Sequence, residues 1–306
     1  MSGAGGRPGL RGAGRQYVHE ILDDRLPGLA AETAFFLVLS IFPALLVGGS
    51  LLGLLEVLVG NDVAELARDR VLGLLSTVLT DEASGVVESV RSLFENSRGG
   101  LLTFATAGAL VSLSGAFAVA INALNLAHDA AETRSWLRRR LLGLVLAIGT
   151  LLLGVVGLGV LVVGPLFGRG EQLADLVGLG SAFAFVWDGV RLPAMALLLL
   201  TWATILLRMA PSRRVRWRDA VPGALLAGVL WGSATVGFRV YLGFAAEGNP
   251  VLGAFGGGAI VMTWTYLLSL GLLLGGELNA VLMQRREVVG AEGQQLALFD
   301  AGSRRQ

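Results

Sequence analysis

The stretch LGLLLGGELNAVLMQRRE, residues 270–287, begins as apolar helix and ends in charge. It closes an apolar run that starts near Val251 and exceeds the ~20 residues that a helix needs to cross a bilayer. Glu277 lies inside this run, and no residue of opposite charge follows it before Arg285. An ionisable group within a span is costly and marks a candidate functional site. The stretch therefore predicts a membrane helix that carries a buried polar group.

Five more apolar blocks precede this one. The 306-residue chain is 54% hydrophobic and only 15% charged, whereas a soluble domain has roughly a quarter of its residues charged. The six blocks that reach spanning length lie near residues 27–55, 101–127, 141–168, 182–207, 220–246 and 251–283. We therefore expect an all-α integral membrane protein, built as a six-transmembrane helix bundle.

The arginines predict the orientation of this bundle. All 24 basic residues are arginine, which is typical of a GC-rich bacterial genome. If both termini lie on one side, 17 arginines outside the spans share that side and five lie on the other. Positively charged loops stay in the cytoplasm, so we expect both termini there and an inner-membrane location.

The connections and tails divide the chain into three parts. We expect a disordered cytoplasmic tail over 1–16, a membrane domain over 17–287 and a flexible cytoplasmic tail over 288–306. The long extracytoplasmic connection, 56–100, has apolar residues at helical spacing and predicts amphipathic helices. These helices either pack on the spans or hold a partner.

Proline and glycine add local expectations. Pro43 lies midway along the first block and predicts a kink, because proline removes a helical hydrogen bond. The kink is either structural or exposes a carbonyl group to a polar cavity. Pairs such as Gly271 and Gly275 let helices approach closely in a membrane.

Several polar residues fall in the cytoplasmic half of the predicted spans. Glu277 lies about 12 Å from Arg285 along the helix axis, at ~1.5 Å per residue. Asn279 must point about 200° away from Glu277, so the two side chains cannot share one small site. The candidates for a water-filled cytoplasmic vestibule are Glu32, Asn122, Asn125, Arg208 and Glu277. The alternative is a hydrogen-bonded network that only locks the bundle.

Two basic clusters, SWLRRRL and RRVRWR, lie at the expected cytoplasmic surface. Basic residues near such a surface gain about 1 kcal/mol each from anionic headgroups. The expected anionic-lipid contacts are Arg138, Arg139, Arg140, Arg213, Arg214, Arg216, Trp217 and Arg218. Nucleic-acid binding is the rival interpretation, but the chain has two histidines, no cysteine and no recognisable metal-ligand pattern. We expect no catalytic residue, metal or cofactor, and no nucleic-acid partner.

The last tail contains QQLALF, residues 294–299. It resembles the short peptide by which bacterial proteins dock onto the replication sliding clamp, through Gln295, Leu296, Leu298 and Phe299. Chance in a tail rich in these residue types is the simpler interpretation.

Three stretches resemble the YihY/BrkB family of bacterial inner-membrane proteins. They are ETAFFLVLSIFP, RMAPSRRVRWRDAVPGALLAGVLW and WTYLLSLGLLLGGELNAVL, and the resemblance covers about residues 17–287. It implies six helices with both ends in the cytoplasm. Some members have carried the label of ribonuclease BN, and others are linked to serum resistance or envelope lipid traffic.

Three functions follow as hypotheses. The first is transport of a lipid or another amphipathic envelope component. The second is cation/proton antiport, with Glu32 and Glu277 as proton carriers. The third is a non-transporting scaffold that uses the 56–100 connection. Membrane lipids are the expected partners, and self-association is left open.

Overall fold

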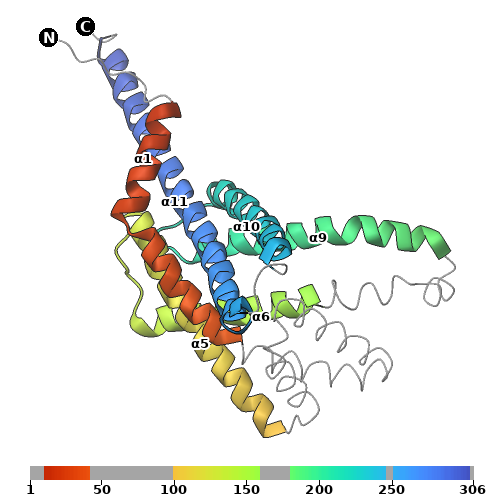
Figure 1. The fold of residues 1–306 in the computed structure, drawn as a ribbon. Coiled ribbons are helices and arrows are strands. Elements are labelled where there is room, and N and C mark those ends of the chain that lie inside the picture. The colour runs from red at the N-terminus through yellow and green to blue at the C-terminus, as the bar shows by residue number, and fades with distance from the viewer. Residues whose placement is uncertain (1–9, 42–98, 159–179, 246–250, 304–306) are drawn as a thin grey trace.

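The computed structural model describes residues 10–41, 99–158, 180–245 and 251–303, in which every regular element is a helix. Helix α1 (Leu10–Asp23) precedes a second helix over Leu26–Ile41. The remaining helices are α5 (Gly99–Ala127), α6 (Trp136–Leu158), α9 (Gly180–Met209), α10 (Trp217–Ala245) and α11 (Val251–Ser303) (Figure 1). The expected all-α class is confirmed for the described part of the chain.

Four of the described helices are long and apolar enough to cross a membrane. They are Ala107–Ala127, Trp136–Gly157, Trp217–Phe238 and Val261–Val288. The other two expected spans coincide with shorter apolar helices, Leu26–Ile41 and Pro193–Met209, so six spans stay a prediction. Pro43 and residues 56–98 of the expected 56–100 connection lie outside the described residues, and α5 begins at the last two positions of that connection.

Both chain ends carry helix where the sequence suggests irregular tails. Helix α1 begins at Leu10, and α11 continues to Ser303 through the segment that contains QQLALF. The segment after Met283 has no proline and is rich in good helix formers, so nothing interrupts the hydrogen-bond ladder. Figure 1 shows α1 and the end of α11 at the same end of the molecule; their cytoplasmic location stays a prediction.

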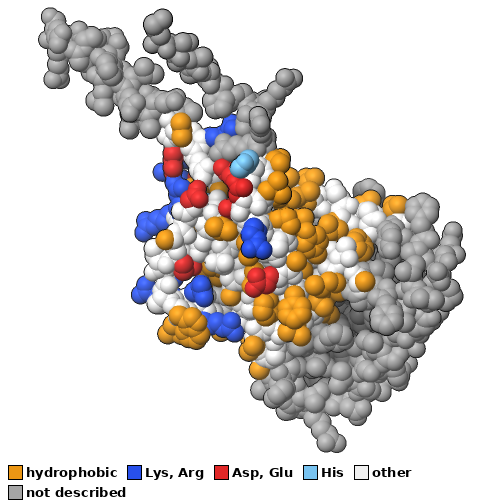
Figure 2. All heavy atoms as spheres, turned by 60° about the vertical axis from the view of Figure 1, so that its left-hand side comes forward, with side chains coloured by type: hydrophobic (Ala, Val, Ile, Leu, Met, Phe, Trp, Pro, Cys, Tyr) orange, Lys and Arg blue, Asp and Glu red, His pale blue; other side chains and the backbone are white. Residues whose placement is uncertain are grey.

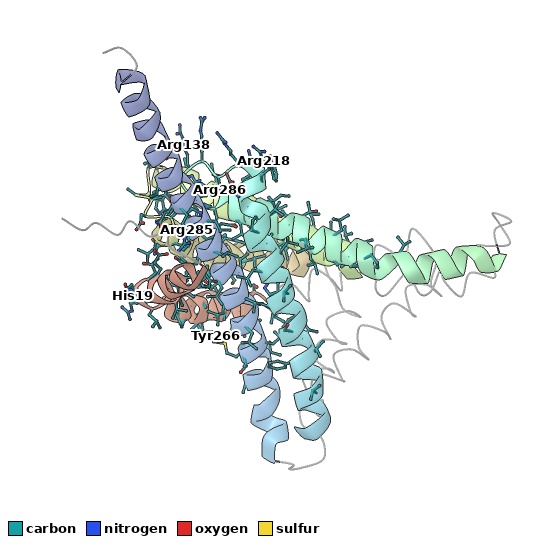
Figure 3. All side chains as sticks on the ribbon, turned by 90° about the horizontal axis from the view of Figure 1, so that it is seen from above. His19, Arg138, Arg218, Tyr266, Arg285 and Arg286 are labelled. Carbon is teal, nitrogen blue, oxygen red and sulfur yellow. The ribbon has the colours of Figure 1, made fainter. Side chains whose placement is uncertain are left out.

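Helices α10 and α11 form the tightest contact and run side by side (Figures 1 and 3). A Cβ atom added at Gly223 would lie 2.0 Å from the carbonyl oxygen of Gly275, so only glycine allows this approach. Asn279 then bridges the pair: its Oδ1 accepts from the Gly223 amide at 2.7 Å, and its Nδ2 donates to the Ala220 carbonyl at 3.1 Å. The expectation that Asn279 faces away from the Glu277 site is confirmed, because Asn279 is occupied by α10.

Side-chain hydrogen bonds fix the other helices around this hairpin. Trp231 of α10 donates to the Leu268 carbonyl at 2.8 Å, and Tyr17 of α1 donates to the Leu274 carbonyl at 2.8 Å. Trp202 of α9 donates to Thr150 of α6 at 3.2 Å. Each bond satisfies a polar atom that burial would otherwise penalise. Helix α11 is thus the element against which α1 and α10 both dock.

The surface separates charge from apolar area. Figure 2 shows acidic and basic side chains gathered on one side, while hydrophobic side chains dominate the adjoining surface. One face of α6 exposes large apolar side chains at helical spacing, namely Leu141, Val145, Ile148, Leu152 and Val156. A stripe of this kind suits contact with lipid tails and explains why these residues need no protein partner.

The Gly223 contact generates a stability prediction. Replacing Gly223 with alanine forces the added methyl group against the Gly275 carbonyl and should cost about 1–3 kcal/mol, as overpacking does. Thermal unfolding in detergent should therefore show a melting temperature lowered by several degrees. Gly232→Ala is the matched control in the same helix, because a Cβ there meets nothing within 4 Å. Equal melting temperatures for the two variants would contradict the packing argument.

Candidate functional site: an arginine pocket and a carboxyl pair

The end of α5 is shaped by a left-handed residue. Asp129 has φ 48°, the Ala130 amide donates to the Asn125 carbonyl and the Asp129 amide donates to the Leu126 carbonyl. This is a Schellman arrangement, which satisfies carbonyls that a helix end leaves open. It turns the chain sharply, so that residues 130–135 run back toward the end of α9.

Asn125 and Glu132 then fix the α9–α10 connection. Asn125 Nδ2 donates to Glu132 at 2.8 Å, while its Oδ1 accepts from the Ser212 amide at 2.6 Å. Glu132 also accepts from the Ser212 hydroxyl at 2.8 Å and from the Arg134 amide at 2.9 Å. Burial tends to raise the pKa of Glu132, but these hydrogen bonds and the Arg134 charge outweigh it and hold the pKa below its usual value. Glu132 is therefore a structural carboxylate that stays ionised at neutral pH.

Arg134 closes the end of α9. Its guanidinium donates to the carbonyls of Met209, Ala210 and Pro211 at 3.0, 2.8 and 2.5 Å. The last carbonyls of a helix lack intrahelical donors and carry partial negative charge, so a guanidinium there is favourable. The α5–α6 and α9–α10 connections are thus joined into one rigid unit.

These two connections enclose an open pocket of about 1130 Å³. Its described lining contains no aspartate or glutamate. The lining residues are Arg134, Arg138, Leu142, Arg208, Met209, Pro211, Ser212, Arg213, Arg214, Val215, Arg216 and Trp217. The pocket lies where α6 and α10 begin, next to the ends of candidate spans.

The arginines of this pocket differ in what they contact. Arg134 is bound to carbonyls, and Arg213 forms an ion pair with Glu287 of α11. Arg208 stacks over the ring of Trp217 at 4.2 Å, and its Nε is buried without a hydrogen-bond partner among the described residues. Within the same residues, no acidic group pairs with Arg138, Arg214 or Arg216. The pocket consequently holds an excess of positive charge.

A second polar group lies on the face of α11 that meets α1. Glu277 is 1% exposed, and the carboxyl groups of Glu20, Asp24 and Asp129 act on it. Glu20 is hydrogen-bonded to Glu277, whereas Oε2 of Glu277 is buried without a hydrogen-bond partner among the described residues. Glu20 and Glu277 thus form a carboxyl pair where α1 packs on α11.

The pKa values of two groups near this pair, Asp24 and Tyr17, are raised. Burial, followed by the charges of Asp129, Glu20 and Asp23, raises the pKa of Asp24. Burial and the neighbouring Glu277 raise the pKa of Tyr17 well above its usual value, so its hydroxyl remains a donor to Leu274. Both shifts reflect a surplus of carboxyl groups in a poorly solvated place.

His128 lies between the two polar regions. Its Nδ1 is 2.8 Å from the Leu124 carbonyl, which only accepts, so Nδ1 carries the proton and Nε2 is the free nitrogen. Burial lowers the pKa of His128, and Arg213 adds to this effect while the Leu124 carbonyl and Asp129 oppose it. The imidazole is thus neutral at neutral pH.

The structure distributes the five predicted vestibule residues over different environments. Glu277 and Asn125 are buried, Arg208 is half-buried in the arginine pocket, and Glu32 and Asn122 are exposed. Glu277 faces the carboxyl groups of α1, while Asn125 contacts Glu132 and Ser212. Of the expected lipid-contact residues, the pocket lining includes Arg138, Arg213, Arg214, Arg216 and Trp217. In the view of Figure 3, Arg138, Arg218 and Arg286 project on the same side of Tyr266.

Sequence reasoning missed the partners of Glu277. Glu20 belongs to α1, a helix that begins before the expected membrane domain, and Asp24 lies in the turn directly after it. Asp129 follows the second span. The repeated acids of HEILDD beside an apolar face could have indicated that α1 packs on the bundle. Within the described residues, no group of three or more histidine, cysteine, aspartate or glutamate side chains is placed to hold a metal ion.

The fold and these sites define a helical membrane protein with a basic pocket at one end of its spans and a buried carboxyl pair beside it. Residues 17–297 match the family described as virulence factor BrkB, and the chain belongs to that family. The sequence resemblance to YihY/BrkB proteins is thereby confirmed.

Individual relatives carry general names. The ribonuclease-like protein YfkH of Bacillus subtilis is 32% identical over 85% of this chain and 90% of its own length. A UPF0761 membrane protein of Stenotrophomonas maltophilia is 29% identical over 87% of this chain, which spans 60% of that relative. The UPF0761 membrane protein PSHAa0171 of Pseudoalteromonas translucida is 25% identical, over 87% of this chain and 84% of its own length. No solved structure matches.

The lowered pKa of Glu132 generates a pH prediction. A carboxyl group with a lower pKa in the folded state stabilises that state above its unfolded pKa, and the contribution is lost as the pH falls through the folded pKa. Glu132→Gln should therefore unfold at a lower temperature than the parent protein at neutral pH, and the gap should narrow in acid. Melting curves of both proteins across this range test it. A gap that stays constant with pH would contradict an ionised Glu132.

Proposed function

We propose that the protein moves a lipid or another amphipathic envelope component in the bacterial inner membrane, without covalent chemistry. The observation that carries the proposal is the composition of the pocket at the ends of the spans. Arginines crowd its wall together with Leu142, Met209, Val215 and Trp217. An amphiphile consists of a charged group joined to apolar chains. At the membrane interface, its charged group could contact the arginines of this wall and its chains the apolar residues.

The exposed face of α6 supports this function. Leu141 and Val145 follow Arg138 along the helix and point outward, so the charged wall passes directly into apolar surface. A lipid whose headgroup enters the pocket can keep its chains beside the spans. The energetic barrier of lipid translocation is the passage of the polar headgroup through hydrocarbon. A pocket at the ends of the spans can hold the headgroup where that passage begins or ends.

A second candidate, cation/proton antiport, is favoured by a different observation. Glu277 is a buried carboxyl group within a candidate span and lies beside Glu20 of α1, and intramembrane carboxyl groups are the usual proton carriers of transporters. The scaffold hypothesis depends on the 56–100 connection, of which residues 56–98 lie outside the described residues.

Lipid translocation is testable in vesicles that contain the purified protein and a fluorescent phospholipid. A membrane-impermeant reductant added outside bleaches only the outer leaflet of protein-free vesicles. With the protein present, we expect bleaching to proceed into the inner-leaflet pool. Bleaching that stops at the protein-free level for anionic and zwitterionic phospholipids alike would rule out this function for those lipids.

Antiport is testable in the same vesicles with an internal pH dye. Addition of sodium or potassium should collapse a preset pH gradient if the carboxyl pair carries protons, and Glu277→Gln should abolish the response while keeping the shape of the side chain. Glu32→Gln is the matched control, because Glu32 is exposed. No response of the parent protein to either ion would remove the antiporter, and equal loss in both variants would favour the five-residue vestibule instead.

A further inference from the structure

The arginine pocket has more positive charge than the protein itself neutralises. Arg134 is committed to three carbonyls and Arg213 to Glu287. Arg138, Arg208, Arg214 and Arg216 line the same space, and within the described residues none of them pairs with an acidic group. Like charges gathered around a concave surface repel one another and focus a positive potential into it. An anion that enters relieves this repulsion.

Arg208 is the residue most specifically prepared for such an anion. Its guanidinium carbon lies over the Trp217 ring, 4.2 Å from the ring centroid, and its buried Nε lacks a hydrogen-bond partner among the described residues. A stacked guanidinium has lost much of its rotational freedom but keeps its in-plane N–H donors available. The N–H donors of Arg208 can therefore bind an acceptor that approaches in the plane of the guanidinium.

The number of cations selects the chemistry of that acceptor. A single carboxylate offers two oxygens and one charge, which one guanidinium satisfies bidentately. Four unneutralised guanidiniums suit a group with more oxygens and a higher charge, and arginine matches phosphate geometry well. A volume of about 1130 Å³ exceeds the roughly 300–1,000 Å³ of typical ligand pockets, so this open pocket has room for a phosphorylated headgroup.

We propose that the pocket formed by Arg138, Arg208, Arg214 and Arg216 binds a phosphate group, with Arg208 as its recognition residue. The inference rests on the proposed function in taking this phosphate from the headgroup of a membrane lipid; a soluble phosphate compound has the same chemistry. The proposed phosphate site excludes Arg139, Arg140 and Arg218, because these residues lie outside the pocket lining.

The test uses the full chain in neutral maltoside micelles, titrated separately with phosphatidic acid, oleate and inorganic pyrophosphate. Native mass spectrometry counts the retained ligand, and tryptophan emission reports the Arg208–Trp217 stack. We expect phosphatidic acid to be retained in preference to oleate and to change the emission. Excess pyrophosphate should compete with it. If pyrophosphate alone binds as tightly as phosphatidic acid, the pocket takes a soluble phosphate and the lipid source is overturned.

Paired charge variants separate the pocket from general surface charge. Arg208→Gln combined with Arg216→Gln should weaken binding of phosphatidic acid at least about tenfold, the loss expected from one charge-assisted contact. Arg139→Gln combined with Arg140→Gln removes the same charge outside the pocket and should leave binding unchanged. Arg216→Gln alone is the safeguard against misfolding, because the Arg216 side chain is exposed and only its backbone carbonyl, which the substitution keeps, accepts hydrogen bonds from Asp219 and Ala220.

Three results would overturn the proposal: no binding, equal retention of oleate and phosphatidic acid, or equal loss in the two double variants. Its failure can be told apart from failure of the proposed function. Phosphate binding without lipid translocation in vesicles would remove translocation alone. If the protein translocates lipid but the Arg208/Arg216 double variant still binds phosphatidic acid as tightly as the parent, only the assignment of the phosphate site to this pocket is overturned.

Discussion

The hydrogen bonds from Arg134 to the end of α9 are the constraint on which the candidate site depends. The α9–α10 connection has no regular structure from Ala210 to Arg216, so its carbonyls need donors from elsewhere. One guanidinium supplies three of them, and Asn125 and Glu132 bind Ser212 from the same side. With its backbone fixed in this way, the connection can present several arginines that would otherwise push it open.

Helix α11 connects the remaining parts of the structure because its different faces contact different helices. Gly275 and Asn279 face α10 and make the closest backbone contact described. Glu277, two residues before Asn279, faces α1 and its carboxyl groups. Farther along, ion pairs from Arg286 to Asp219 and from Glu287 to Arg213 fasten α11 to the α9–α10 connection and the start of α10. A single helix therefore supplies one carboxyl group of the pair and holds Arg213 of the pocket lining through Glu287.

The sequence predicts these features unequally. Apolar runs and helical periodicity give the helices, and a turn of 100° per residue suffices to separate Glu277 from Asn279. The partners come from contacts that no local pattern encodes: Ser212 lies 87 residues from Asn125, and Ala210 lies 76 from Arg134. Glu32 and Asn122 are expected in the vestibule from the sequence but are exposed. The sequence predicts how far along its helix a residue lies, whereas the neighbouring helices decide which face of that helix is buried.

The turn between α5 and α6 joins the two polar regions physically. Asp129 acts on Glu277 and accepts from Gln284 of α11 at 2.9 Å, while Glu132 and Arg134, a few residues later, hold the wall of the arginine pocket. His128 lies between them and senses both Arg213 and Asp129. Two systems of opposite charge thus share one short, heavily hydrogen-bonded segment. A change in the charge of either system therefore acts on that segment, through the field of Asp129 on one side and the hydrogen bonds of Glu132 and Arg134 on the other.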